Sequence, residues 1–288
     1  MKKIIVILGP TASGKSALAV KIARKFNGEV VSADSRQIYR GMDIGTGKIS
    51  KKEMQGVPHY LLDVAGPKQR FTASQYKQSA LNAIDKIFRK GKLPILCGGT
   101  GFYIRAVIDG ILMPEVPPDW KLRKKLDKRT PKELLQMLKR LDSRRAKTIE
   151  KENPRRLIRA LEIVLKTKKP VPEFQKNPLP YPVLFLGAEI TKKELAKRVE
   201  KRIEKMFKLG LEKEAKRFPL PIIGYQEWKD YFKEKITKKE VKTLIKIHTL
   251  QFAKRQMTWW KKDERIKWVK NYREAEKSAR NFLDEFSQ

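Results

Sequence analysis

The clearest chemical signature in the chain is the segment "GPTASGKS" near its start. Its spacing matches the pattern G-x-x-x-x-G-K-[ST], in which glycines let successive backbone N–H groups point inward at phosphate oxygens. The helix expected from Lys15 onward adds its positive end, Lys15 adds a full charge, and the Ser16 hydroxyl can hold Mg²⁺. We therefore predict a phosphate site made of Gly9, Pro10, Thr11, Ala12, Ser13, Gly14, Lys15 and Ser16.

The pattern does not say which phosphate is bound, because a pyrophosphate on an organic tail presents the same oxygens as the end of ATP. An ATPase usually has a second carboxylate at the end of another apolar strand, and both Asp34 and Asp63 are candidates. Asp34 ends the run "EVVSAD", on the same side of the predicted sheet as the phosphate loop. By position alone it can be a metal ligand, a general base or a helix cap.

The elements that must position these residues alternate between strands and helices. Apolar runs at 2–8, 29–34, 58–64 and 93–99 predict strands, and the segments 15–26 and 72–90 predict helices. Thr72 and Gln75 have capping-box spacing for the second helix. This order predicts an α/β fold, a P-loop NTPase-like parallel sheet flanked by helices, with ligands at the carboxyl ends of the strands.

The amino-acid composition of the chain changes after Gly110, where the segment "MPEVPPDW" is rich in proline. Thr130-Pro131 with Glu133, and Asn153-Pro154, have the signals of helix starts. We therefore predict an inserted all-helical subdomain at 115–180 and a core made of 1–114 and 181–288. A strand at "VLFLGAEI" returns the chain to the core, a long helix follows from Thr191 to Gly210, and the rest should be helical and basic.

The composition points to a polyanionic partner. Lysine and arginine number 67 against 32 acidic residues, a formal net charge of +35. A lysine-rich protein adapted to heat should carry matching glutamate, and here it does not. The chain has one cysteine and two histidines, which excludes an internal disulfide and a His/Cys metal site. The first apolar run is too short for a signal peptide and no stretch approaches membrane-spanning length, so we expect a cytoplasmic protein.

Several segments together resemble the landmarks of the tRNA isopentenyltransferase family, the tRNA dimethylallyltransferases. They are "GPTASGKS", "ADSRQIYRGMDIGTGK", "PHYLLD", "CGGTGFYIRA", "NPRRLIRALEI", "IGYQE" and "FAKRQMTWW", in this order from Gly9 to Trp260. A phosphate loop alone is shared by many functions, whereas "DSRQIYRGMDIGTGK" together with "GGTGFY" is nearly diagnostic.

The resemblance implies transfer of a dimethylallyl group from dimethylallyl diphosphate to N6 of the adenosine just 3′ of the anticodon in tRNA. The phosphate loop would hold the donor diphosphate with Mg²⁺ as cofactor, and Arg202 would reach the diphosphate from a helix. Asp34 would accept the N6 proton and Thr100 would contact the extruded base. A monomer is enough for this chemistry and no obligate protein partner is inferred, although the sequence leaves the oligomeric state open.

The resemblance also implies contacts with the anticodon stem-loop. Arg36 and Gln37 depart from the small or aliphatic residues found after "DS" in other members, which affects the detailed base contacts. Trp259 and Trp260 are interpreted as packing residues. The implied tRNA-binding residues are Asp34, Ser35, Arg36, Gln37, Thr100, Arg123, Arg155, Arg156, Leu157, Ile158, Arg159, Lys254 and Arg255.

Two other classes of function remain as alternatives. A small-molecule or nucleotide kinase would share the fold, with Asp34 as base or metal anchor and Arg202 as a lid arginine. The excess charge and the "GGTGFY" segment are not needed for a small substrate. A basic RNA-binding ATPase or scaffold without transfer chemistry would not need the pair Asp34 and Thr100.

Overall fold

The computed structural model describes residues 2–173 and 175–285, which fold into two units. The core unit comprises Met1–Gly110 and Pro178–Gln288, and the inserted unit is Ile111–Asn177, against the range 115–180 expected from the sequence. The inserted unit closes at its base, because the Leu112 N–H donates to the Gln175 carbonyl at 3.0 Å.

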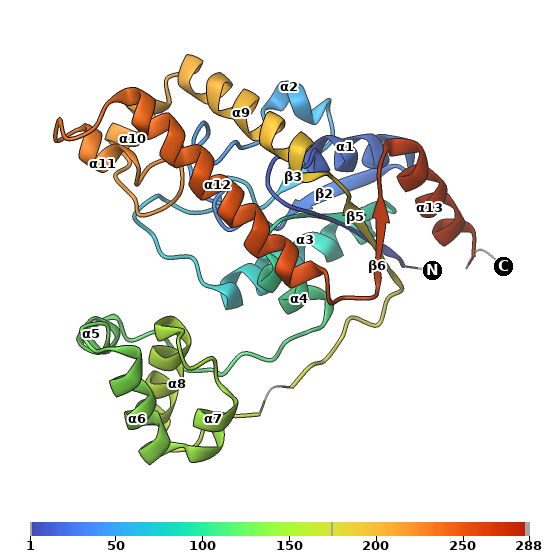
Figure 1. The fold of residues 1–288 in the computed structure, drawn as a ribbon. Coiled ribbons are helices and arrows are strands. Elements are labelled where there is room, and N and C mark those ends of the chain that lie inside the picture. The colour runs from blue at the N-terminus through green and yellow to red at the C-terminus, as the bar shows by residue number, and fades with distance from the viewer. Residues whose placement is uncertain (1, 174, 286–288) are drawn as a thin grey trace. The chain divides into compact units, whose positions relative to one another are not determined.

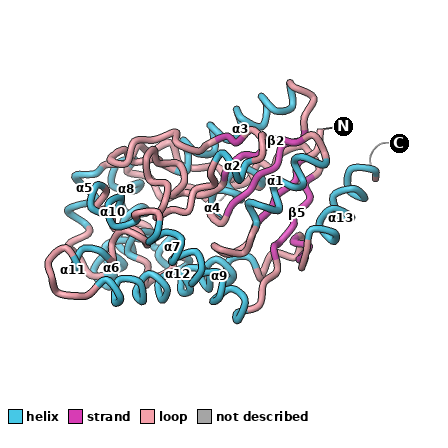
Figure 2. The backbone as a smooth tube through the Cα atoms, turned by 90° about the horizontal axis from the view of Figure 1, so that it is seen from above, coloured by secondary structure: helices cyan, strands magenta, loops and turns pink. Residues whose placement is uncertain are grey.

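A parallel sheet lies at the centre of the core unit (Figures 1 and 2). In the described residues it has six strands in the order β3-β2-β4-β1-β5-β6, and all neighbours are parallel. The strands are β1 (Ile4–Leu8), β2 (Gly28–Ser32), β3 (His59–Tyr60), β4 (Leu93–Gly98), β5 (Val183–Ala188) and β6 (Ile266–Val269). This sheet, flanked by helices, confirms the predicted P-loop NTPase-like fold class.

Helices cover both faces of the sheet because the buried strand β1 presents apolar side chains to each. Val6 packs into a cluster with α3 (Ala73–Arg89) and α4 (Gly101–Ile108). Ile7 belongs to the opposite cluster, with α1 (Lys15–Lys25) and α13 (Tyr272–Asp284), which pack against each other (Figure 2). The strand ends that should carry the site are thereby held by a core on both sides.

A helical layer at the carboxyl side of the sheet packs on the loop that follows β2. Helices α9 (Lys192–Lys208) and α12 (Lys238–Trp260) lie side by side (Figure 1). Their buried residues Val199, Ile203 and Val241 share a cluster with Met42 of that loop. The further helices of the core unit are α2 (Lys51–Met54), α10 (Leu211–Arg217) and α11 (Trp228–Tyr231). No described helix combines the length and apolar character that crossing a membrane requires.

The inserted unit is helical and has its own apolar core, in which Leu134, Leu138, Leu157 and Leu161 are fully buried. The predicted helix starts are confirmed: Thr130 and Glu133 form a capping box with Pro131 in the first turn, and Asn153 caps the last helix. Its helices are α5 (Trp120–Leu126), α6 (Pro131–Leu141), α7 (Ser143–Thr148) and α8 (Pro154–Thr167).

Two sequence expectations about strands were wrong. The expected strand at 58–64 is only His59–Tyr60, because Leu61 and Asp63 adopt positive φ angles of 63° and 58° that end the extended backbone. The expectation that the chain after Gly210 is entirely helical missed β6, which pairs with β5 at the sheet edge. Four residues are too few for their alternation to be distinguished from a helix face.

Candidate active site

The phosphate loop connects β1 to α1 and has the backbone that its glycines predict. Gly9 and Gly14 have φ angles of 151° and 92°, values that favour glycine. The Ser13 N–H donates to the Pro10 carbonyl at 3.2 Å, which closes the turn. No side chain caps the start of α1, so the helix offers its first N–H groups to an anion.

Lys15 is a buried cation at the centre of this loop. Its Nζ donates to the Pro10 carbonyl at 3.1 Å. Burial lowers the pKa of Lys15 from its ordinary value, and the charge of Asp34 offsets this only in part. The hydroxyl of Ser13 is buried without a hydrogen-bond partner within the described residues. A bound phosphate would provide a counter-charge for the Lys15 ammonium and a hydrogen-bond acceptor for the Ser13 hydroxyl.

Strands β2 and β4 are adjacent and parallel, so they end at the same edge of the sheet. The residues that follow them there are Asp34, Ser35 and Thr100. The Ser35 N–H donates to Thr100 Oγ1 at 3.0 Å, and the Thr100 hydroxyl donates to Ser35 Oγ at 3.3 Å. The Arg36 N–H donates to Asp34 Oδ1 at 2.9 Å, which orients the carboxylate. Gly98 allows this approach, because a Cβ there would lie 2.1 Å from the Ala33 carbonyl oxygen.

The structure brings two of the predicted phosphate residues and two of the predicted acceptor residues into one pocket. Lys15, Ser16, Asp34 and Gln37 all line it. Cys97 lines it too, but burial raises the pKa of its thiol to about 12, so it remains protonated near neutral pH. The pocket therefore places a carboxylate beside two residues of the phosphate loop.

Two arginines of α9 reach the phosphate loop. Arg202 Nη1 donates to Thr11 Oγ1 at 3.4 Å and Nη2 to the Thr46 carbonyl at 2.8 Å. Burial lowers the pKa of Arg202 and Asp34 acts in the opposite direction, yet a guanidinium stays charged at neutral pH. Arg198, one turn earlier, donates to the Ser13 carbonyl at 2.9 Å.

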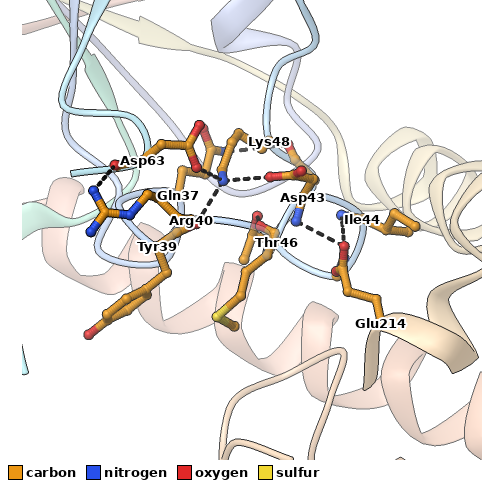
Figure 3. Close-up of polar contacts among 12 residues, drawn as sticks. Gln37, Tyr39, Arg40, Asp43, Ile44, Thr46, Lys48, Asp63 and Glu214 are labelled. Carbon is orange, nitrogen blue, oxygen red and sulfur yellow. Dashed lines mark hydrogen bonds and ion pairs between the residues drawn. The ribbon is translucent and has the colours of Figure 1, made fainter. Parts of the chain in front are cut away.

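Asp63, the alternative second carboxylate, is engaged elsewhere (Figure 3). Its Oδ1 pairs with Lys48 Nζ, which also donates to the Tyr39 carbonyl at 2.7 Å and to Asp43 Oδ1 at 2.6 Å. This lysine is the centre of a network that braces the loop after β2. Asp34 is thus the carboxylate that faces the phosphate loop.

Two residues of this site were not predicted from the sequence. Gln256 of α12 accepts a hydrogen bond from the Thr11 N–H at 2.8 Å and donates to the Gly99 carbonyl at 2.9 Å. Glu214 of α10 binds backbone N–H groups of the loop after β2. Gln256 lies within the segment "FAKRQMTWW", in which the sequence predicts a binding role only for Lys254 and Arg255.

The predicted tRNA residues of the core unit lie in different surroundings. The Arg36 guanidinium lies over the Phe252 ring of α12, 4.3 Å from its centroid. Lys254 and Arg255 are exposed on α12. Trp260 is buried, as expected for a packing residue, whereas Trp259 is 40% exposed. Exposed cations and an exposed aromatic ring on one helix suit contacts with RNA.

The predicted tRNA residues of the inserted unit do not all face solvent. Arg155 and Arg156 are exposed on α8. Leu157 and Ile158 are buried in the apolar core of the unit, so the prediction that they bind tRNA is wrong for their side chains. The remaining two, Arg123 and Arg159, both pair with the buried carboxylate of Glu162.

The oxygen donors of the pocket fit Mg²⁺ bound mainly through substrate. In residues 2–173 and 175–285 no group of three or more His, Cys, Asp or Glu side chains could hold a metal by itself. Mg²⁺ does not need such a cage, since it keeps several waters and binds phosphate oxygens with one or two protein oxygens. The hydroxyl of Ser16 and the carboxylate of Asp34, which both line the pocket, meet that description.

Comparison with known proteins gives consistent matches. The family model described as IPP transferase matches residues 37–263. The tRNA dimethylallyltransferase of Acetivibrio thermocellus is 39% identical over 287 residues, covering 93% of this chain and 92% of the relative. That of Carboxydothermus hydrogenoformans is 40% identical over 292 residues, covering 95% of this chain and 94% of the relative.

Solved structures agree with the sequence relatives and confirm the resemblance. The tRNA isopentenylpyrophosphate transferase of Bacillus halodurans is 33% identical, with a TM-score of 0.73 and coverage of 99% of this chain and 96% of that one. A eukaryotic dimethylallyltransferase, described as acting on tRNA, has a TM-score of 0.83 at 26% sequence identity. This match covers 99% of this chain and 80% of the eukaryotic one. This chain belongs to the IPP transferase family, in which its near-full-length curated relatives are tRNA dimethylallyltransferases.

Proposed function

We propose that the chain transfers a dimethylallyl group from dimethylallyl diphosphate to N6 of the adenosine just 3′ of the anticodon in tRNA, releasing pyrophosphate. The observation that carries this proposal is that Lys15 and Ser16 of the phosphate loop line the same pocket as Asp34. A family of tRNA dimethylallyltransferases supplies the substrate class.

The donor end of the pocket would stabilise the leaving group. As the bond between C1 of the dimethylallyl group and the diphosphate oxygen breaks, both bonding electrons go to pyrophosphate. Lys15, Arg202 and the uncapped N–H groups of α1 would meet this charge as cations and hydrogen-bond donors. Lys15 is buried and Arg202 is half-buried, and electrostatic stabilisation is stronger in such surroundings than in water.

The acceptor end of the pocket would prepare the amine. The N6 lone pair is delocalised into the adenine ring, so N6 gains nucleophilicity when a base accepts its proton as the new N–C bond forms. The Asp34 carboxylate would accept that proton, with its orientation set by the Arg36 N–H. Thr100, held by Ser35, would contact the extruded base.

Ser16 would hold Mg²⁺ against the diphosphate, where the ion would neutralise part of the charge of the leaving group.

We also propose that the protein works in the cytoplasm, where tRNA is modified, and that a monomer carries the chemistry. Arg155 and Arg156 of the inserted unit, and Lys254 and Arg255 of the core unit, would contact tRNA phosphates.

One assay tests the proposal directly. Purified protein is incubated with labelled dimethylallyl diphosphate and unmodified tRNA, and separately with labelled ATP and small acceptors. The expected result is that the label of dimethylallyl diphosphate appears in tRNA when the protein and both substrates are present. Phosphorylation of a small acceptor from ATP, with unlabelled tRNA, would establish the kinase alternative in its place.

A further inference from the structure

The loop that follows β2 is held by one carboxylate of α10 (Figure 3). Glu214 Oε2 accepts hydrogen bonds from the N–H groups of Asp43 and Ile44, each at 3.0 Å, and Oε1 accepts one from Gly45 at 2.8 Å. The Tyr225 hydroxyl also donates to Oε1, at 2.6 Å. Hydrogen bonds to an ionised acceptor are about twice as strong as neutral ones.

The loop is built to fit this carboxylate closely. Gly45 lies under Tyr225, so that a Cβ at this position would stand 2.5 Å from the tyrosine ring. Burial raises the pKa of Tyr225, and the Glu214 carboxylate raises it further, so the phenol remains a hydrogen-bond donor. Three consecutive backbone N–H groups thus converge on Glu214 at one point of the loop.

The next residues of the same loop contact Arg202. The Thr46 carbonyl accepts the 2.8 Å hydrogen bond from Arg202 Nη2, and a Cβ on Gly47 would lie 1.9 Å from that nitrogen. Arg202 in turn reaches Thr11 of the phosphate loop. Arg202 and Glu214 belong to consecutive helices, α9 and α10, which therefore hold the loop at adjoining points.

We infer that Glu214 is a positioning residue for the donor diphosphate, which it serves by holding the loop that orients Arg202. This inference rests on the proposed function, in which Arg202 binds the diphosphate. The carboxylate fixes residues 43–45, which fixes the Thr46 carbonyl one residue later. That carbonyl holds one amino group of Arg202, so that the other faces the phosphate loop.

The test variant is Glu214→Gln, because an amide has the size of the carboxylate but presents an NH₂ group to backbone donors. Its matched control is Glu212→Gln on the same helix, since Glu212 pairs with Lys238 at 2.6 Å, away from the loop. Binding of inorganic pyrophosphate and of dimethylallyl diphosphate is measured by calorimetry, and the KM values for both substrates by steady-state kinetics.

We expect Glu214→Gln to weaken pyrophosphate binding and to raise the KM for dimethylallyl diphosphate by about tenfold, with the KM for tRNA unchanged. In an Arg202→Ala background the same change should add no further loss, because both act through one guanidinium. Wild-type binding after Glu214→Gln, or losses that multiply in the double variant, would overturn the inference. Unchanged pyrophosphate binding in Arg202→Ala alone would instead refute the proposed role of Arg202.

A second variant covers the case in which Glu214→Gln does not fold. Tyr225→Phe removes only the hydroxyl that donates to Oε1 and leaves the carboxylate on its N–H groups. It should raise the donor KM by about twofold to threefold in the wild-type background and not at all with Arg202→Ala. An equal effect in both backgrounds would show a structural role and overturn the inference.

Discussion

The side chain of Gln256 accepts a hydrogen bond from the N–H of Thr11 at 2.8 Å. Its amide nitrogen donates to the Gly99 carbonyl at 2.9 Å. One buried carboxamide thereby joins the phosphate loop to the segment that carries Thr100. In the proposed reaction these two segments hold the donor and the acceptor.

Gln256→Ala should lower kcat by about tenfold to a hundredfold, because the two reacting groups would no longer be held at a fixed separation. Steady-state kinetics with both substrates, together with a melting curve, measures this. Thr258→Ala is the control, since Thr258 is exposed on the same helix and its hydroxyl donates to the Lys254 carbonyl of that helix. Equal activity of the two variants would contradict a joining role for Gln256.

The distance along the chain explains which parts of this site could be predicted from the sequence. The phosphate loop and Asp34 each directly follow a strand, and parallel strands end at the same edge of a sheet, so their proximity follows from the pattern. Gln256 bonds to a residue 245 positions away, and Glu214 to one 171 positions away. Periodicity indicates which face of their helices is buried but not what that face meets.

In the inserted unit, one ion pair could have been predicted from the sequence. Arg159 and Glu162 are three residues apart on α8, a spacing that brings side chains together on a helix. The second partner, Arg123, lies on α5 and could not be found from local spacing. Charge counts predicted a basic surface but did not separate internal ion pairs from residues free to meet a phosphate.

Asp34→Asn should reduce the rate of transfer by about a hundredfold or more, because the amide keeps the shape of the side chain but cannot accept a proton. The KM for dimethylallyl diphosphate and the affinity for tRNA should change little. Single-turnover kinetics with saturating substrates measures the chemical step. Asp63→Asn tests the alternative carboxylate, and we expect it to retain transfer; loss of activity in that variant alone would reverse the assignment.

Arg155→Ala should raise the KM for tRNA at physiological salt and leave the donor KM unchanged, because Arg155 is an exposed cation on α8. The slope of log affinity against log salt concentration should fall by about one unit. Fluorescence titration of tRNA at several salt concentrations measures the slope. Arg144→Ala is a control in the same unit, since its guanidinium already pairs with Glu173 at 2.7 Å. The same slope in both variants would count against a phosphate contact.

Glu162→Gln should destabilise the protein without a direct effect on the diphosphate site. Glu162 is fully buried, and its carboxylate accepts hydrogen bonds from Arg123, at 2.6 and 2.8 Å, and from Arg159. Removing the charge should lower the free energy of unfolding by about 2 kcal/mol at pH 7. Urea unfolding followed by circular dichroism measures this difference.

The same ion pair predicts a dependence on pH. Burial alone would raise the pKa of Glu162, but hydrogen bonds from Arg123, the Asp119 N–H and Arg159 outweigh it and lower the pKa below its ordinary value of 4.5. A carboxylate with a lowered folded pKa contributes stability above the unfolded pKa and loses it as the pH falls through the folded value. The difference in unfolding free energy between wild type and Glu162→Gln should therefore be full at pH 7 and shrink progressively below about pH 4.5. A difference of the same size at pH 7 and pH 3 would show that the loss comes from altered packing and not from the charge.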